Sequence, residues 1–491
     1  MIKRNIIANY IGQFYLAIIG LVVIPFYLEK LGSEGYGLIG FFTMLQGWMQ
    51  LLDMGISTTI AREATIAKNN QQKAIFFKGL QKAITYFFLL IAMMIFLSGI
   101  MSAEWITKNW LTTSLSVSLV TFSVSSMFVT IAFRWLCGPW RSTLIGLEKQ
   151  IQLNIINIII ATLRFPVSVI ILILTHNSLY SYFIYQIIIA FIELIIFYLS
   201  AIYHTPYKDK SPRIDKKFIR ESIPILKFAL SIAFTSGVWV LITQTDKLLL
   251  SYLLPLNEFG FYSMGVIAAS GLMILSQPIA QAILPRLTSL HVEQKNKELI
   301  FVYRNSSRIM ALIILPVSIL LSGYAYHAIY IWTGSHQVAK EVAPILCWYA
   351  LGNGILAISA FPYYLQYAHG NIRLHVIGNI IFLITFIPTI YFTGVNYGAT
   401  GVAKTWFFQN LIYLIIWAGI VHKRFLPNSH IKWLFLDIMP FMLFPLLFIF
   451  FQKNIEAVIP DSRVIWFILL ILLSGTCLMI NKIILKTFKN E

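Results

Sequence analysis

Residues 151–174 have the sequence IQLNIINIIIATLRFPVSVIILIL. Of these 24 side chains 18 are apolar, and the segment is long enough to cross the hydrocarbon core of a bilayer, which takes a helix of about 20 residues. A segment in lipid must satisfy its backbone hydrogen bonds internally, so we expect an α-helix. Arg164, near the middle, is the only charged residue in it. The segment predicts an all-α membrane protein with a cation held inside the bilayer.

The whole chain has the same character as this segment. Of its 491 residues, 58% are hydrophobic and 11% are charged, against about 45–50% and about 25% in soluble domains. Such a chain cannot hide its apolar surface from water, so a water-soluble fold is excluded. Apolar runs predict a polytopic protein with about 14 transmembrane helices. These spans lie at 6–28, 36–60, 79–101, 111–133, 151–174, 180–203, 223–253, 258–283, 307–331, 342–366, 372–393, 399–420, 433–451 and 464–481.

Basic residues set the predicted orientation. The chain has 37 Lys and Arg against 19 Asp and Glu, a formal net charge of +18. With the N-terminus inside, 29 of the 37 fall in cytoplasmic segments or at the inner ends of spans, 5 in outer segments and 3 deeper within spans. Because cytoplasmic loops are enriched in Lys and Arg, we expect both termini in the cytoplasm. No exposed basic domain is available to hold a duplex, so nucleic acid is not expected as a partner.

A weak internal repeat divides the chain at an offset of about 222 residues. Residues 151–160 parallel residues 372–381, and Phe165-Pro166 is echoed by Phe386 and Pro388. The alternative is chance similarity between apolar spans. Six spans in each half predict a parallel repeat with its axis along the membrane normal, and a central cavity between two bundles. The predicted domains are an N-terminal six-helix bundle at 1–205, a cytoplasmic linker at 206–222, a C-terminal six-helix bundle at 223–425 and two additional helices at 426–491.

Three cations within the spans are candidates for substrate binding, namely Arg164, Lys247 and Lys404. Ionisable residues inside a membrane are costly and usually functional. Arg164 is too deep to reach either surface easily, so it either binds an anionic group or pairs with Glu193, midway along the next span. Lys404 lies about one turn inside its span, and extension to the interface is the alternative for it.

Three carboxylates within the spans are candidates for binding a coupling ion, H+ or Na+. They are Asp53, Glu193 and Asp246. The alternatives are a structural ion pair for Glu193 and hydrogen bonding to a neighbouring N–H for Asp53. Asp246 and Lys247 are adjacent and project about 100° apart on a helix, so the sequence predicts that they do not pair with each other.

Uncharged polar residues recur at helical spacing in several spans. Positions three, four and seven apart share one helix face, and a polar face in lipid must look at protein or water. The alternative to a cavity is hydrogen bonding between helices, worth about 0.6–2 kcal/mol per contact. The candidates for lining a cavity are Asn9, Gln50, Asn154, Asn157 and Gln277.

The sequence contains no recognisable catalytic or cofactor motif. It has no GxxxxGK phosphate loop, no GxSxG and no HExxH. Cys137, Cys347 and Cys477 are far apart, which favours neither a disulfide framework nor a metal site. We therefore expect no enzymatic activity, no cofactor and no metal.

Two sets of motifs occur at the first two spans of each half. The first set is YLEKLGSEGYG at 27–37 and LLDMGI at 51–56; the second is TDKLLL at 245–250, FGFYS at 259–263 and AILPRL at 282–287. Both sets resemble the recurring pattern of Wzx-type O-antigen and polysaccharide flippases, which belong to the superfamily that also includes the MATE exporters. The motifs are specific to the family and do not identify the sugar.

The resemblance implies a substrate of undecaprenyl diphosphate that carries a short oligosaccharide, an O-antigen repeat unit. Alternating access would move it from the cytoplasmic to the periplasmic leaflet of the bacterial inner membrane, coupled to H+ or Na+. Arg164, with Lys247 or Lys404, would bind the diphosphate, since an anion needs cations to leave water. Other polysaccharide-assembly membrane proteins are expected partners.

Rival functions remain open from the sequence. A MATE-like cation antiporter that exports drugs should have an acidic lumen. The spans contain similar numbers of basic and acidic residues, so counting charges neither supports nor excludes this function. A polysaccharide polymerase or ligase is expected to have a large outer loop, whereas the predicted outer loops here are short. A passive lipid scramblase would differ in being independent of an ion gradient.

Overall fold

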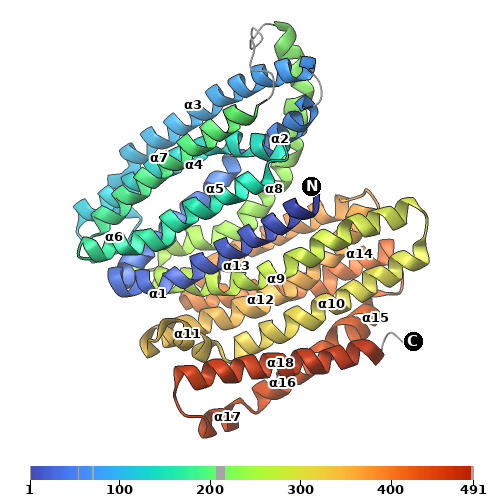
Figure 1. Ribbon diagram of the computed structural model, residues 1–491. Helices are drawn as coiled ribbons and strands as arrows, with labels where there is room; N and C mark the ends of the chain where they lie inside the picture. The colour runs from blue at the N-terminus through green and yellow to red at the C-terminus, as the bar shows by residue number, and fades with distance from the viewer. Residues whose placement is uncertain (1, 54, 69–70, 206–215, 488–491) are drawn as a thin grey trace. The chain divides into compact units, whose positions relative to one another are not determined.

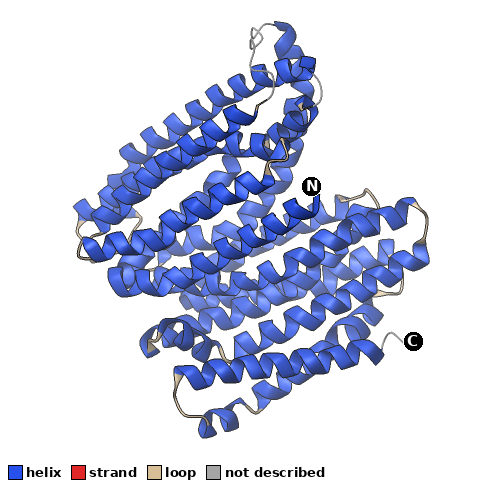
Figure 2. Cartoon of the chain, viewed as in Figure 1, coloured by secondary structure: helices blue, strands red, loops and turns tan. Residues whose placement is uncertain are grey.

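The structure, a computed structural model, describes residues 2–53, 55–68, 71–205 and 216–487 (Figure 1). Within these ranges the chain is helical without any strand, and one isolated bridge joins Thr112 to Pro255 (Figure 2). The predicted all-α, polytopic membrane class is confirmed. Residues 206–215 of the predicted cytoplasmic linker lie outside the described ranges.

Eleven helices of the described chain are long and apolar enough to cross a membrane. Two of these are long enough for two crossings, since Asn9–Asp53 has 45 residues and Arg373–Phe425 has 53, and about 20 residues suffice for one. Each is bent at a glycine with positive φ, Gly32 at 72° and Gly398 at 58°, where the sequence places an outer turn. The predicted seventh span lies in α8 (Lys216–Leu253), which is not among the eleven. The count of fourteen stays a prediction.

Contacts divide the chain into two compact units, Met1–Gly260 and Phe261–Glu491. The helix α8 contacts α1 and α2 and so belongs to the first unit, although the sequence repeat groups it with the second half. The boundaries predicted for the two six-helix bundles, 1–205 and 223–425, differ from those of the contact units and stay a prediction. The first unit contains α1 (Ile2–Met49), η1 (Gln50–Asp53), α2 (Ile56–Ala67), α3 (Gln71–Asn109), α4 (Val117–Gly146), α5 (Gln150–Thr162), η2 (Leu163–Val167), α6 (Ser168–Leu174), α7 (Leu179–His204), α8 and the start of α9 (Leu256–Val292).

The helix α4 is central to the first unit. It packs along α3 and along α7, and the three helices lie side by side in Figure 1. Between α3 and α4, the Phe88 and Trp135 rings stack with centroids 4.7 Å apart. The helix continues to Gly146, whereas the apolar run predicted its end near residue 133, because the sequence criterion stopped at the first charge. Arg134 and Arg141 are therefore helical residues and not loop residues.

The second unit holds the remaining helices. It contains the rest of α9, α10 (Asn296–Gly323), α11 (Ala325–Thr333), α12 (His336–Ala368), α13 (Arg373–Ile412), η3 (Tyr413–Trp417), α14 (Ala418–Phe425), α15 (His430–Lys432), η4 (Trp433–Ile438), η5 (Met439–Met442), α16 (Leu443–Phe450), α17 (Gln452–Val458) and α18 (Arg463–Thr487). Its core includes buried side chains from α10 and α12, such as Ile314 and Phe361.

An ion-pair clamp joins the C-terminal helices to α10. Asp437, in the π-helical segment η4, is fully buried. Its carboxylate accepts hydrogen bonds from Arg304 Nε at 2.6 Å and Nη2 at 2.9 Å, and from Arg308 Nε at 2.7 Å. The two arginines lie one helical turn apart on α10, so both reach the same carboxylate. The additional helices predicted from the sequence are thus tied to the bundle by buried charge.

Replacing Asp437 by Asn is expected to destabilise the protein by about 3 kcal/mol, because it leaves two partly buried guanidiniums without their counter-charge. This loss of stability is at the low end of the range for broken buried ion pairs, because 31% of the Arg304 side chain is exposed and water can solvate part of its charge. Thermal unfolding in detergent measures the change. Asp461→Asn, at a carboxylate with 64% of its side chain exposed, is the matched control, and equal melting temperatures for the two variants would contradict the clamp.

Candidate functional site

The helix that carries Arg164 is interrupted at that residue. The α-helical pattern of α5 gives way to the π-helical segment η2 before α6 continues. Pro166 has no backbone N–H and its ring crowds the preceding turn, so a regular α-helical ladder cannot run through it. Two side chains of α7 bond the carbonyls instead: Tyr185 Oη donates to the Leu163 carbonyl at 2.8 Å, and Gln186 Nε2 to the Arg164 carbonyl at 3.2 Å. The bulge is thereby fixed against α7.

Tyr27 holds the same bulge from α1. Its hydroxyl lies 2.5 Å from Ser168 Oγ, and its ring meets Tyr182 edge to face with centroids 5.5 Å apart. Ser168 also donates to the Phe165 carbonyl at 2.7 Å. Because α1 and α7 both contact the bulge, the position of the Arg164 backbone is set by two neighbouring helices.

Glu193 of α7 gathers three arginines around one buried carboxylate, a group called here the arginine cluster (Arg134, Arg141, Arg164 and Glu193). Arg164 Nη2 lies 2.5 Å from Glu193 Oε2, and Arg141 Nη2 lies 3.0 Å from Oε1. Arg134 Nε is farther from Oε2, at 3.8 Å. The Glu193 side chain is 3% exposed, so the cations replace the water that an ionised carboxylate requires.

Spacing along two parallel helices brings these residues together. Arg134 and Arg141 are seven residues apart on α4, as are Gln186 and Glu193 on α7, and positions seven apart share one helix face. Arg134 Nη2 donates to Gln186 Oε1 at 3.0 Å, and seven residues further along both helices Arg141 Nη2 donates to Glu193 Oε1 in the same way. The guanidinium of Arg134 also lies 5.3 Å from the centre of the Phe42 ring, a cation–π contact that helps to bury it.

The arginine cluster carries an excess of positive charge. Three guanidiniums surround a single carboxylate, which gives a net charge of +2. The Nε atoms of Arg134 and Arg164 are buried and donate no hydrogen bond within the part of the chain that the structure describes. Buried donors are normally satisfied, and Arg is well suited to bidentate phosphate binding. The cluster can therefore bind an anion.

Asp53 lies at a break in the second predicted span. The helix α1 ends at Met49, and Gly55 adopts a left-handed conformation with φ 65° before α2 begins. The Asp53 carboxylate accepts from Ser57 Oγ at 2.5 Å and from Ser57 N at 3.4 Å. This is the neighbouring N–H acceptor that the sequence left open as an alternative to ion binding.

Asp246 and Lys247 are paired, so the prediction that they do not interact was wrong. Lys247 Nζ lies 3.4 Å from Asp246 Oδ1 and donates to the Thr243 carbonyl at 2.5 Å. The error was to consider only the Cα–Cβ directions, because the long lysine side chain bends back along its own helix. The Asp246 carboxylate is buried, at 4% exposure.

Asn9 and Asn154 bond each other, with Asn154 Nδ2 donating to Asn9 Oδ1 at 2.6 Å. This contact joins α1 to α5, which is the inter-helix alternative considered for polar stripes. Asn157 is half-buried one turn along α5, and Gln50 and Gln277 are exposed. No three His, Cys, Asp or Glu side chains meet in the described ranges as a metal site would require.

The remaining predicted cation, Lys404, is exposed in the second unit. Its ammonium lies 5.8 Å from the centre of the Trp348 ring. The structure thus brings Arg164 and Glu193 together, and likewise Asp246 and Lys247, all within the first unit. Arg134 and Arg141 were missed by the sequence analysis, although their spacing of seven, matched by Gln186 and Glu193, was an available signal.

Comparisons with known proteins agree with this architecture. Residues 2–291 match the family of polysaccharide biosynthesis proteins. A putative O-antigen transporter of Shigella flexneri is 22% identical over 417 residues, which cover 82% of this chain and 94% of that protein.

Two solved structures share the fold. The lipid II flippase MurJ, in an inward closed conformation, has a TM-score of 0.71 at 15% identity over 99% of this chain and 100% of that one. An inward-facing multidrug resistance MATE family transporter of the MOP superfamily has a TM-score of 0.63 at 13% identity over 85% and 95%. The chain therefore shares the fold of these two proteins and is a multi-pass helical membrane protein. The chain belongs to the polysaccharide biosynthesis protein family, and the similarity to Wzx-type flippases is confirmed.

Proposed function

We propose that this protein is a flippase for undecaprenyl-diphosphate-linked oligosaccharide, an O-antigen repeat unit. It moves the lipid from the cytoplasmic to the periplasmic leaflet of the inner membrane by alternating access. The observation that carries the proposal is the arginine cluster, with its net charge of +2 and the partly exposed guanidiniums of Arg141 and Arg164.

A diphosphate is the complementary ligand for such a cluster. Its negative charges offset the excess positive charge, and its oxygens accept from guanidinium N–H groups. Arg164 and Arg141 have 22% and 44% of their side chains exposed, so an anion can reach both. The polyprenyl tail can stay in the bilayer while the charged head crosses, which keeps the most costly group out of hydrocarbon.

The comparisons support this substrate class. The relative from Shigella flexneri is named a putative O-antigen transporter, and the structurally similar MurJ a lipid II flippase. A drug-exporting antiporter is the rival, because MATE transporters share the fold. An excess of buried positive charge disfavours cationic cargo, so the cluster supports the flippase over the exporter.

We assign ion coupling to Asp53 or Asp246, with H+ or Na+ as the ion. Glu193, the third candidate, is compensated by three guanidiniums, which favours its ionised form and makes it the weakest candidate for proton binding. Lys247 and Lys404 are retained as candidate cations for the substrate. Rocking of two six-helix bundles at 1–205 and 223–425, with both termini in the cytoplasm, is the proposed motion, and other polysaccharide-assembly membrane proteins are the proposed partners.

Complementation of a flippase-null bacterial strain tests the proposal. The strain must synthesise a repeat unit that this protein transports. Expression of the chain in such a strain is expected to restore the surface polysaccharide. A drug-susceptibility panel on a strain lacking the chain's gene tests the rival in parallel. Restored polysaccharide with unchanged drug susceptibility supports the flippase; drug hypersensitivity without any polysaccharide defect overturns it.

A further inference from the structure

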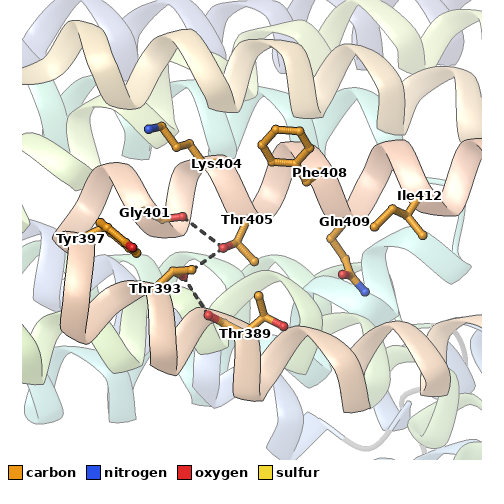
Figure 3. Close-up of a pocket in the computed structure, with 9 residues that line it drawn as sticks. All are labelled: Thr389, Thr393, Tyr397, Gly401, Lys404, Thr405, Phe408, Gln409 and Ile412. Carbon is orange, nitrogen blue, oxygen red and sulfur yellow. Dashed lines mark hydrogen bonds between the residues drawn. The ribbon is translucent and has the colours of Figure 1, made fainter.

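The helix α13 folds back on itself and forms a groove in the second unit. Its turn is at Gly398, with φ 58° and ψ −148°, a conformation that glycine adopts most readily. Between the two arms lies a cavity of about 470 Å³ (Figure 3). Its lining residues are Thr389, Thr393, Tyr397, Gly401, Lys404, Thr405, Phe408, Gln409 and Ile412.

Threonine oxygens supply hydrogen-bond acceptors to this groove. Thr389 and Thr393 donate their hydroxyl protons to carbonyls one turn earlier, at 2.7 and 2.8 Å. Thr405 donates to the Gly401 carbonyl at 3.1 Å, and its oxygen is 2.9 Å from that of Thr393 (Figure 3). In the Thr393–Thr405 contact one hydroxyl donates to the other and uses one lone pair of the accepting oxygen. Each hydroxyl oxygen has two lone pairs, so lone pairs remain for a ligand that donates, such as a hydroxyl group.

Lys404 supplies the cation. Its side chain is exposed, and its ammonium lies 5.8 Å from the centre of the Trp348 ring. It lies six residues beyond Gly398, or about 9 Å along the helix from the turn. With the turn at a membrane surface, as the sequence predicts, the ammonium lies near the depth of lipid headgroups, where lysine side chains commonly reside.

An apolar strip continues from Lys404 along the same arm. Phe408 and Ile412 follow at spacings of four residues and are both exposed, so they share a face with Lys404. Gln409, on the adjoining face, donates to Thr385 Oγ1 at 2.5 Å across the two arms. Thr393, Lys404 and Thr405 lie nearest the turn at Gly398, and Ile412 lies farthest from it, which matches the division of a lipid into head and chain. Thr389 lies between these ends, at the depth of Phe408.

We propose that this groove binds a lipid whose head carries a phosphate ester beside hydroxyl groups. The Lys404 ammonium binds the phosphate, Thr389 and Thr393 accept from the hydroxyls, and Phe408 and Ile412 contact the hydrocarbon chain. Phosphatidylglycerol of the bilayer and a glycosylated diphosphate lipid share this chemistry. The groove lies in the second unit and shares no residue with the arginine cluster. It does include Lys404, which is also a candidate cation for the substrate, so for a glycosylated diphosphate lipid the inference rests on the proposed function, whereas for phosphatidylglycerol it does not.

Lipid titration of the purified protein in maltoside micelles tests the groove, with bound lipid counted by native mass spectrometry. Dioleoylphosphatidylglycerol and undecaprenyl phosphate are the two phosphate probes, and monogalactosyldiacylglycerol, which has hydroxyls without phosphate, is the third. Lys404→Gln is expected to weaken binding of the phosphate lipids about ten-fold, the effect of losing one hydrogen bond to a charged group. Thr389→Val with Thr393→Val should weaken phosphatidylglycerol more than dioleoylphosphatidic acid, whose head lacks the glycerol hydroxyls.

The matched control is Lys340→Gln, at an exposed lysine of α12 outside the groove lining, and it should bind as the unmodified protein does. Thermal unfolding without added lipid verifies that each variant folds. Tighter binding of phosphatidylglycerol than of undecaprenyl phosphate, whose head has no hydroxyl group beside the phosphate, supports the groove. Tighter binding of undecaprenyl phosphate would show that the threonine oxygens do not select hydroxyls and would overturn the proposal. Equal binding by the Lys404 and Lys340 variants, or galactolipid binding as tight as phosphatidylglycerol binding, overturns it. In the Arg164→Gln background, Lys404→Gln should still weaken phosphatidylglycerol binding by the same factor, which separates this test from that of the proposed function.

Discussion

Arg164→Ala is expected to abolish surface polysaccharide in a complemented flippase-null strain, while the protein still accumulates in the membrane. Each hydrogen bond between charged groups is worth about 1.5–3 kcal/mol, so loss of this guanidinium should lower diphosphate affinity ten-fold or more. Folding should survive because Glu193 keeps Arg141 at 3.0 Å and Arg134 at 3.8 Å. Immunoblotting of membranes and gel analysis of surface polysaccharide measure the two effects separately.

The conservative variant refines this test. Arg164→Lys keeps the charge and loses the planar, bidentate group, so partial polysaccharide is expected. Arg373→Ala, at an exposed arginine of the second unit, controls for the loss of one positive charge and should behave as the unmodified chain does. Normal polysaccharide from Arg164→Ala would show that the arginine only balances Glu193.

The sequence was sufficient to predict the helical membrane class, because span length and hydropathy reflect the thickness and polarity of the bilayer. It also singled out Arg164 and offered two roles for it, either a ligand of the substrate or the partner of Glu193 in an ion pair. The structure shows the ion pair at 2.5 Å and leaves the substrate role as a proposal. One residue in this cluster can serve both functions, since Arg164 pairs with Glu193 in a group that keeps excess charge.

Long-range pairing was beyond the sequence argument. Arg134 and Arg141 were counted as cytoplasmic because hydropathy treats any charge as the end of a span, whereas Glu193 on another helix compensates them within the structure. Likewise, the polar stripe of α5 left two explanations for Asn154, the lining of a cavity or a hydrogen bond to another helix. The structure shows its hydrogen bond to Asn9 of α1. Periodicity predicts which face is polar, but not which partner that face meets.

Glu193→Gln is expected to be the most destabilising change in the first unit, by about 3–5 kcal/mol, because it leaves three guanidiniums close together without a counter-charge. The carboxylate is nearly fully buried, so water cannot replace it. Thermal unfolding in detergent measures the loss. Glu148→Gln removes a carboxylate that pairs with Lys68 at 2.6 Å on the exposed surface and should change the melting temperature little, since surface ion pairs contribute little.

Two further measurements separate the charge of the cluster from its packing. The double variant Glu193→Gln with Arg141→Gln returns the net charge to that of the native cluster and should recover part of the lost stability, as coupled neighbouring residues do. Inorganic pyrophosphate should raise the melting temperature of Glu193→Gln more than that of the unmodified protein, since a ligand that binds the folded state stabilises it. If the double variant is no more stable than Glu193→Gln and pyrophosphate has no effect on either protein, then the cluster holds the helices by packing alone and has no capacity to receive a diphosphate.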